Sequence, residues 1–124
     1  MIQGIGMDLI ELDRIENSID KDNRLADRVL TAKEKEMFHQ LPNKTRQVEF
    51  LAGRFAAKEA FAKAVGTGIG QLSFQDIEIL TNDNGAPVIE AIGYEANRIF
   101  VSITHSRDYA AAQVVVERTE GNEL

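Results

Sequence analysis

The chain has 124 residues and a formal net charge of −6 at pH 7. Hydrophobic residues make up 44% and charged residues 27%, which excludes an intrinsically disordered or collagen-like protein. The length fits one domain over 1–124. Because the chain has no cysteine, it can form no disulfide framework, thiolate nucleophile or zinc–thiolate site, and its two histidines are too few for a histidine-rich metal centre.

The charge is unevenly distributed along the chain. Residues 14–64 hold 11 Lys and Arg against 8 Asp and Glu, whereas the remainder holds 3 against 12. We call 14–64 the cationic island; it indicates either an ordinary helical surface or a docking face for an acidic protein or a phosphorylated ligand. The acidity of the rest argues against nucleic acid as a partner.

The N-terminal segment MIQGIGMDLIELDR carries acids where a secretory signal would carry bases. No stretch approaches the roughly 20 apolar residues that a membrane span needs. We therefore expect a cytoplasmic protein without a membrane partner.

The first half of the chain is mostly helical in its pattern. A strand is predicted over 2–9, with two glycines that would let another backbone or a ligand approach closely. The helices are predicted over 11–20, from a Thr31–Glu34 capping box to about Gln40, and over 44–65 ahead of Gly66.

The second half changes to the alternating pattern of strands. An Asp-Asn-Gly turn at 83–85 indicates a hairpin, and the tail 117–124 is expected to fray. The strands are predicted over 74–81, 87–91, 99–104 and 110–116. The sum is an α+β fold, in which one long central helix and shorter helices pack on a small antiparallel sheet.

The predicted helix 44–65 is apolar nearly all round, which is typical of a central, buried helix. Arg54 and Lys58 project among its apolar residues, and buried charges are costly unless they are paired. Either they reach the edge of the core, or they line a cavity that holds an anionic ligand. Glu59 and Lys63 lie four residues apart on one face, as in an ordinary surface pair or in a site.

Asp8 follows the two glycines in an apolar strand, where an acid is out of place. It either caps the helix predicted next or, together with Glu59, forms a site for a hard cation. Mg²⁺ fits such a pair, because it keeps several waters and needs only one or two carboxylates plus substrate phosphates.

Two further segments carry candidate ligand contacts. Gly66-Thr67-Gly68 either caps the helix or brings the backbone close to a nucleotide, with Lys63 and Thr67 as donors. His105 ends the strand SITHS as either a hydrogen-bond donor or a phosphate contact. The chain has no GxSxG elbow, which argues against a serine hydrolase.

Three motifs, in this order and spanning nearly the whole chain, resemble the bacterial holo-(acyl-carrier-protein) synthases, the small trimeric phosphopantetheinyl transferases. They are GIGMDL at 4–9, RFAAKEAFAKA at 54–64 followed by GTG at 66–68, and SITHS at 102–106. The resemblance implies the phosphopantetheinyl transferase fold and a place in fatty acid biosynthesis. It also implies Mg²⁺-dependent transfer of 4′-phosphopantetheine from coenzyme A to a serine of apo-acyl carrier protein, releasing adenosine 3′,5′-bisphosphate.

The same resemblance implies roles for individual residues. Asp8 and Glu59 would bind Mg²⁺ and, with Lys63, would be catalytic; a carboxylate or a metal-associated water oriented by Glu59 would take the serine proton. Coenzyme A would contact Arg46, Arg54, Lys63, Gly66, Thr67, Gly68, Thr104 and His105. Arg14, Arg24 and Arg28 would grip the acidic helix of the carrier protein. The site would lie between neighbouring subunits of a homotrimer.

Two other functions fit part of the pattern. A non-enzymatic module could dock an acidic protein on the cationic island and would not need Asp8 or Glu59. A Mg²⁺-dependent nucleotide hydrolase would use the same acids with water, in place of a protein hydroxyl, as the acceptor.

Overall fold

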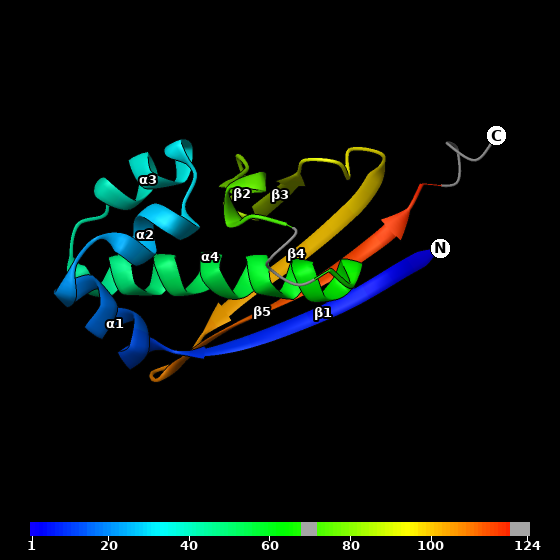
Figure 1. The fold of residues 1–124 in the computed structure, drawn as a ribbon. Coiled ribbons are helices and arrows are strands. Elements are labelled where there is room, and N and C mark those ends of the chain that lie inside the picture. The colour runs from blue at the N-terminus through cyan, green and yellow to red at the C-terminus, as the bar shows by residue number, and fades with distance from the viewer. Residues whose placement is uncertain (68–71, 120–124) are drawn as a thin grey trace.

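A long helix lies across an antiparallel sheet in the computed structural model, which describes residues 1–67 and 72–119 (Figure 1). The larger sheet has the order β1-β5-β4, with β1 at Ile2–Glu11, β4 at Asn97–His105 and β5 at Tyr109–Arg118. The smaller sheet pairs β2 (Ile77–Thr81) with β3 (Pro87–Ala91). Both sheets are antiparallel, so the α+β prediction is confirmed.

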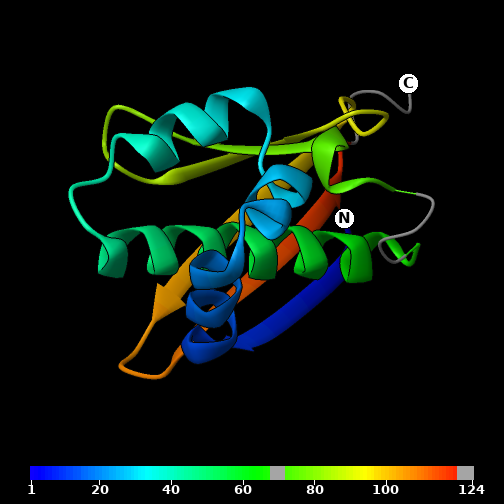
Figure 2. The same ribbon diagram turned by 60° about the vertical axis from the view of Figure 1, so that its left-hand side comes forward.

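The helices cover one side of the larger sheet. They are α1 (Leu12–Lys21), α2 (Arg24–Val29), α3 (Ala32–His39) and α4 (Lys44–Val65), with a 3₁₀ turn η1 at Phe74–Asp76. Figures 1 and 2 show α4 on the sheet, with α1, α2 and α3 gathered over its N-terminal half. Within residues 1–67 and 72–119, none of the helices is both long and apolar enough to cross a membrane.

The close approach expected at the glycines of β1 is made by the backbone of α4. A Cβ built on Gly4 would lie 1.9 Å from the Ala64 carbonyl oxygen, and one on Gly6 would lie 1.9 Å from that of Ala60. Because side chains alternate along a strand, Asp8 shares the face of Gly4 and Gly6 that is turned to α4. The glycines thus seat the strand that carries Asp8 directly on the long helix.

Two expectations about element ends are wrong, and one helix was missed. Residues 74–76 form a 3₁₀ turn, not the start of a strand. Residues 117 and 118 continue β5 and do not fray, whereas 120–124 lie outside the described residues. The helix Arg24–Val29 was not predicted, because six residues make fewer than two turns and show little periodicity.

Two charged residues of α4, Arg54 and Lys58, have placements that the sequence pattern left undecided. Lys58 and Glu34 are both 0% exposed, and their Nζ and Oε1 atoms lie 2.6 Å apart. Lys58 therefore neither reaches the edge of the core nor lines a ligand cavity, so both interpretations are wrong for it. Arg54 is also buried; its guanidinium lies 4.2 Å from the Phe50 ring centroid and donates to the Ile79 carbonyl at 3.1 Å.

Candidate functional site

The acids expected to bind a metal lie where β1 packs on the C-terminal half of α4. Lys63 Nζ lies 3.0 Å from Asp8 Oδ1 and donates to the Met7 carbonyl, also at 3.0 Å. Glu59 is one helical turn before Lys63 on the same face of α4. The N-cap of α1 is Glu11, so the interpretation of Asp8 as the cap of that helix is wrong.

The electrostatics of this group suit a cation. Burial and the nearby Asp8 carboxylate raise the pKa of Glu59 above its ordinary value, while Lys63 and Arg28 act in the opposite direction. A divalent cation between two repelling carboxylates would relieve this penalty, and the oxygen donors are those that Mg²⁺ prefers. The described residues bring no third acid, histidine or cysteine into such a group, so the remaining ligands would be waters and substrate oxygens.

The end of α4 lies next to this acidic group. Gly66 has a left-handed φ of 80°, and its amide donates to the Lys63 carbonyl at 3.2 Å. The Thr67 amide donates to the Ala62 carbonyl at 3.2 Å, which confirms the predicted helix cap. Gly68 lies outside the described residues.

A second group of predicted site residues lies at the other end of α4. Arg46 Nε is 3.9 Å from one oxygen of Glu49, and His105 Nδ1 is 3.4 Å from the other. His105 comes from the end of β4, where Thr104 is exposed beside it. One carboxylate therefore holds a guanidinium and an imidazole side by side at the surface.

The two groups do not meet within one chain. At about 1.5 Å of rise per residue, Arg46 and Glu59 stand about 20 Å apart along α4. Arg54 belongs to neither group, because its guanidinium is turned to the Phe50 ring and β2. Burial lowers its pKa, and within residues 1–67 and 72–119 its buried Nε has no hydrogen-bond partner.

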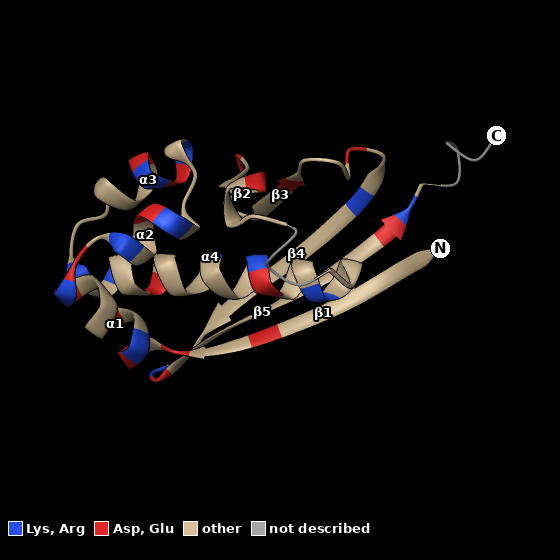
Figure 3. Ribbon diagram, viewed as in Figure 1, with Lys and Arg blue, Asp and Glu red and all other residues tan. Residues whose placement is uncertain are grey.

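The arginines expected to bind a carrier protein are exposed on α1 and α2. Arg14 lies on α1, Arg24 pairs with Asp22 at 3.7 Å, and Arg28 lies over the Phe74 ring with its Cζ 5.4 Å from the centroid. Figure 3 shows charged residues concentrated on α1, α2 and α3 and sparse along the larger sheet.

Two features of the site were missed from the sequence. Glu49 joins Arg46 to His105, and the signal for it was its place three residues after Arg46 on one helix face. The electrostatic influence of Arg28 on Glu59 depends on the packing of α2, a helix that was not predicted, so no local pattern announced it.

Residues 4–114 match the family model described as the 4′-phosphopantetheinyl transferase superfamily. A holo-(acyl-carrier-protein) synthase of Geobacillus sp. strain WCH70 is 59% identical over 95% of this chain and 98% of its own. That of Bacillus subtilis strain 168 is 56% identical over the same shares.

Solved structures agree with the sequence matches. The holo-(acyl-carrier-protein) synthase of Bacillus anthracis strain Ames, in complex with CoA (3′,5′-ADP), superposes with a TM-score of 0.88 at 48% identity, covering 96% of this chain and 99% of that one. The Helicobacter pylori enzyme in complex with coenzyme A gives 0.80 at 32% identity, covering 91% and 99%. The chain therefore belongs to the 4′-phosphopantetheinyl transferase superfamily and, within it, to the holo-(acyl-carrier-protein) synthases.

Proposed function

We propose that this chain transfers 4′-phosphopantetheine from coenzyme A to a serine hydroxyl of apo-acyl carrier protein, in a Mg²⁺-dependent reaction. The observation that carries the proposal is the group of Asp8, Glu59 and Lys63, gathered on β1 and α4 beside the capped end of that helix. Membership of the holo-(acyl-carrier-protein) synthases supplies the substrate pair.

In this reaction the serine oxygen bonds to the phosphorus that bears pantetheine. The bond from that phosphorus to the bridging oxygen breaks, and adenosine 3′,5′-bisphosphate leaves. Asp8 and Glu59 would hold Mg²⁺, which supplies charge neutralisation on the diphosphate. Lys63, exposed and already paired with Asp8, keeps that carboxylate oriented and offers a positive charge to the same phosphates.

The serine proton has two possible acceptors, Glu59 itself and a water that Glu59 orients. In the metal-free protein, Glu59 lies close enough to Asp8 for that carboxylate, together with burial, to raise its pKa. This supports a role for Glu59 in either route, since both depend on its position and charge.

We assign the coenzyme A contacts to both ends of α4. Lys63, Gly66 and Thr67 would serve the diphosphate side, together with Gly68. Arg46, Thr104 and His105 would serve the adenosine bisphosphate, where Glu49 sets the spacing of the guanidinium and the imidazole. Arg54, which belongs to neither group, would have to turn away from the Phe50 ring to join them. Because about 20 Å of helix separates the two sets, each active site would need two chains.

An apolar face of the larger sheet supports assembly of the homotrimer. Ile5, Met7 and Leu9 of β1 are 57–63% exposed, and Phe100 of β4 is 53% exposed. Ile5 and Phe100 both pair with Val115 of β5, so their side chains stand in one row across the sheet. Burial of this face against further copies would remove these exposed apolar side chains from water.

The exposed arginines supply the docking surface for the second substrate. Arg14, Arg24 and Arg28 would meet the acidic helix of the carrier protein, which fits the positive sign of the cationic island. We also propose that residues 1–124 form one domain and that the protein acts in the cytoplasm.

A mass measurement tests this function directly. Incubation with coenzyme A, Mg²⁺ and apo-carrier protein should raise the carrier mass by about 340 Da, the mass of the added phosphopantetheine. Asp8→Asn should abolish the gain while the variant stays folded and still binds the carrier, which also excludes a mere docking module. Consumption of coenzyme A without a change in carrier mass would instead identify a nucleotide hydrolase.

A further inference from the structure

Helix α2 is too short to hold its own position. Six residues form few internal hydrogen bonds, and such helices depend on tertiary contacts. The last carbonyls of any helix also have no partner within the helix. The placement of Arg28, the next-to-last residue of α2, is therefore decided by whatever binds this end.

Two side chains from elsewhere bind the end of α2. Gln75 Nε2, from η1, lies 3.1 Å from the Asp27 carbonyl oxygen, 3.2 Å from that of Arg28 and 2.7 Å from that of Leu30. Lys58 Nζ, from α4, donates to the remaining carbonyl of the run, that of Val29, at 2.6 Å. Four consecutive carbonyl oxygens are thus met by two side chains, which we call the α2 clamp (Lys58 and Gln75).

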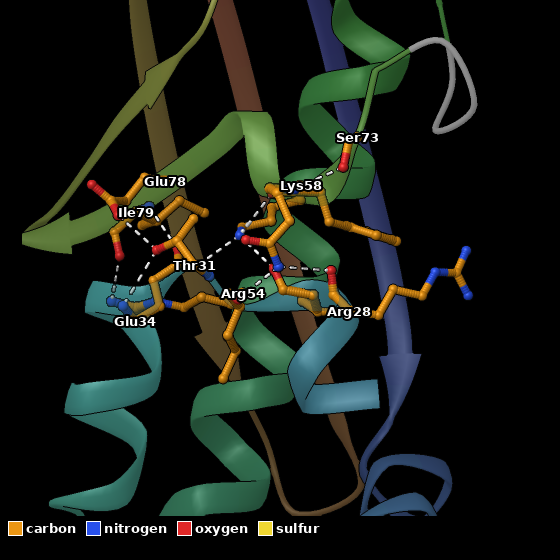
Figure 4. A network of polar contacts seen from close by, with 12 residues as sticks. Arg28, Thr31, Glu34, Arg54, Lys58, Ser73, Glu78 and Ile79 are labelled. Carbon is orange, nitrogen blue, oxygen red and sulfur yellow. Dashed lines mark hydrogen bonds and ion pairs between the residues drawn. The ribbon is translucent and has the colours of Figure 1, made fainter. Parts of the chain in front are cut away.

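The Lys58 half of the clamp is fixed in place by a buried network. Its ammonium pairs with Glu34, whose other oxygen accepts the Ile79 amide at 2.7 Å, while Thr31 and Glu34 close the capping box of α3. Figure 4 shows these side chains converging between α3, α4 and β2, with the Arg28 guanidinium pointing away from them. A fully paired ammonium in the core has little freedom to move.

The clamp also reaches the surface on which Arg28 lies. Lys58 Nζ donates to the Phe74 carbonyl at 3.1 Å, and the ring of Phe74 carries the Arg28 guanidinium. Lys58 directly precedes Glu59 in α4. Lys58 therefore connects three places: the Val29 carbonyl beside Arg28, the backbone of Phe74, whose ring lies under Arg28, and the turn of α4 that carries Glu59.

We propose that Lys58 and Gln75 are positioning residues that hold Arg28 at a fixed place beside the Glu59 segment of α4. The inference rests on the proposed function, because Arg28 is there a docking residue for the carrier protein. The clamp would present the Arg28 guanidinium to the carrier in an ordered position, so that carrier binding would not include the entropic cost of ordering α2.

The test is a double-mutant cycle on carrier affinity, measured by fluorescence anisotropy with labelled apo-carrier protein. Gln75→Met keeps the length of the side chain and removes the amide donor. Because Gln75 is exposed, the variant should still fold. We expect Gln75→Met and Arg28→Gln each to weaken carrier binding about tenfold, and the double variant to be no more than about twofold weaker than Arg28→Gln alone. The affinity for coenzyme A should change less than about twofold in all three.

Controls separate positioning from general damage. Gln40→Met makes the same change at an exposed residue after α3 and should leave carrier affinity unchanged. In the wild type, the Phe74 ring should shift the Arg28 Hε resonance upfield; this shift should be lost in Gln75→Met and in Lys58→Met but kept in Gln40→Met. The inference would be overturned if the double variant lost carrier affinity by the product of the two single losses. An unchanged Arg28 resonance in Gln75→Met, or an equal loss of affinity for coenzyme A, would overturn it as well. A wild type that transfers no phosphopantetheine would instead refute the proposed function.

Discussion

Gly6 of β1 lies so close to Ala60 of α4 that a Cβ on Gly6 would stand 1.9 Å from the Ala60 carbonyl oxygen. The obstacle is helix backbone, which cannot rotate aside as a side chain can. This contact sets how near Asp8, two residues further along β1, comes to Glu59 and Lys63. The spacing of strand and helix is therefore part of the site's geometry.

We expect Gly6→Ala to destabilise the fold by about 2 to 3 kcal/mol, as overpacking of a closely packed interior does. It should also weaken Mg²⁺ binding, because the strand carrying Asp8 must move away from α4. Urea unfolding measures the first effect and calorimetric titration with Mg²⁺ the second.

Gly53→Ala is the matched control for this substitution. Its Cβ would meet the Ile103 Cγ2 methyl, at 2.9 Å, and that side chain can shift. Alanine also favours a helix interior over glycine by up to about 1 kcal/mol, so we expect little net change. Equal losses for the two variants would mean that the Gly6 contact is not special.

The buried pair of Lys58 and Glu34 gives a second expectation. Burial lowers the pKa of Lys58, and Glu34 opposes this effect by stabilising the ammonium. Lys58→Met should cost about 3 to 5 kcal/mol, because it leaves Glu34 charged and unpaired in the core. The double variant Lys58→Met/Glu34→Gln should recover part of that loss in urea unfolding; a double variant no more stable than the single one would show that the charge of Glu34 is not the cause.

The pH dependence of stability follows from Glu59. Its folded-state pKa lies above the ordinary value, so the folded state binds the proton more tightly than the unfolded chain does. The contribution of Glu59 to stability therefore falls as pH rises from about 4.5 through the raised pKa. In EDTA we expect Glu59→Gln to melt at a higher temperature than the wild type at pH 7.5 and at the same temperature near pH 4.

Addition of Mg²⁺ should reverse that order, because the cation stabilises only chains with both carboxylates. Thermal unfolding at both pH values, with EDTA or with Mg²⁺, makes the comparison. If Mg²⁺ stabilised the wild type and Glu59→Gln equally, Glu59 would not be a ligand of the metal.

Reversal of the charge at Arg14 should separate the two substrates. We expect Arg14→Glu to raise the KM for the carrier protein at least about tenfold and the KM for coenzyme A less than about twofold, since an exposed charge on α1 acts on encounter with an acidic partner. Steady-state kinetics with each substrate varied in turn measures this. A parallel rise in both constants would place Arg14 at the coenzyme A site instead.

Local signals in the sequence were sufficient for much of the fold. Thr31 and Glu34 form the predicted capping box, Gly66 ends α4, and the glycines of β1 mark a close backbone approach. These features are decided within a few residues of chain, where spacing and residue type are informative.

The same local signals could not predict contacts between residues that are far apart in the sequence. The partner of Lys58 is Glu34, which the capping box had already explained, so nothing in the sequence marked its second role. Within the α2 clamp, the hydrogen bonds of Gln75 join a 3₁₀ turn to a helix that was not predicted, so they depend wholly on tertiary packing. For the candidate site, the sequence supplied the residue types, but the separation of Arg46 from Glu59 emerged only with the length of an unbroken α4.

We propose that each active site combines the acidic group of one chain with the Arg46 and His105 group of another. Subunit mixing tests it most directly, with carrier mass as the readout. Asp8→Asn chains and Arg46→Ala/His105→Ala chains should each be inactive alone. After unfolding together and refolding in equal amounts, they should regain about a quarter of wild-type activity, since about one interface in four pairs two intact halves. Activity that stays at the level of the separate variants would contradict a site shared between chains.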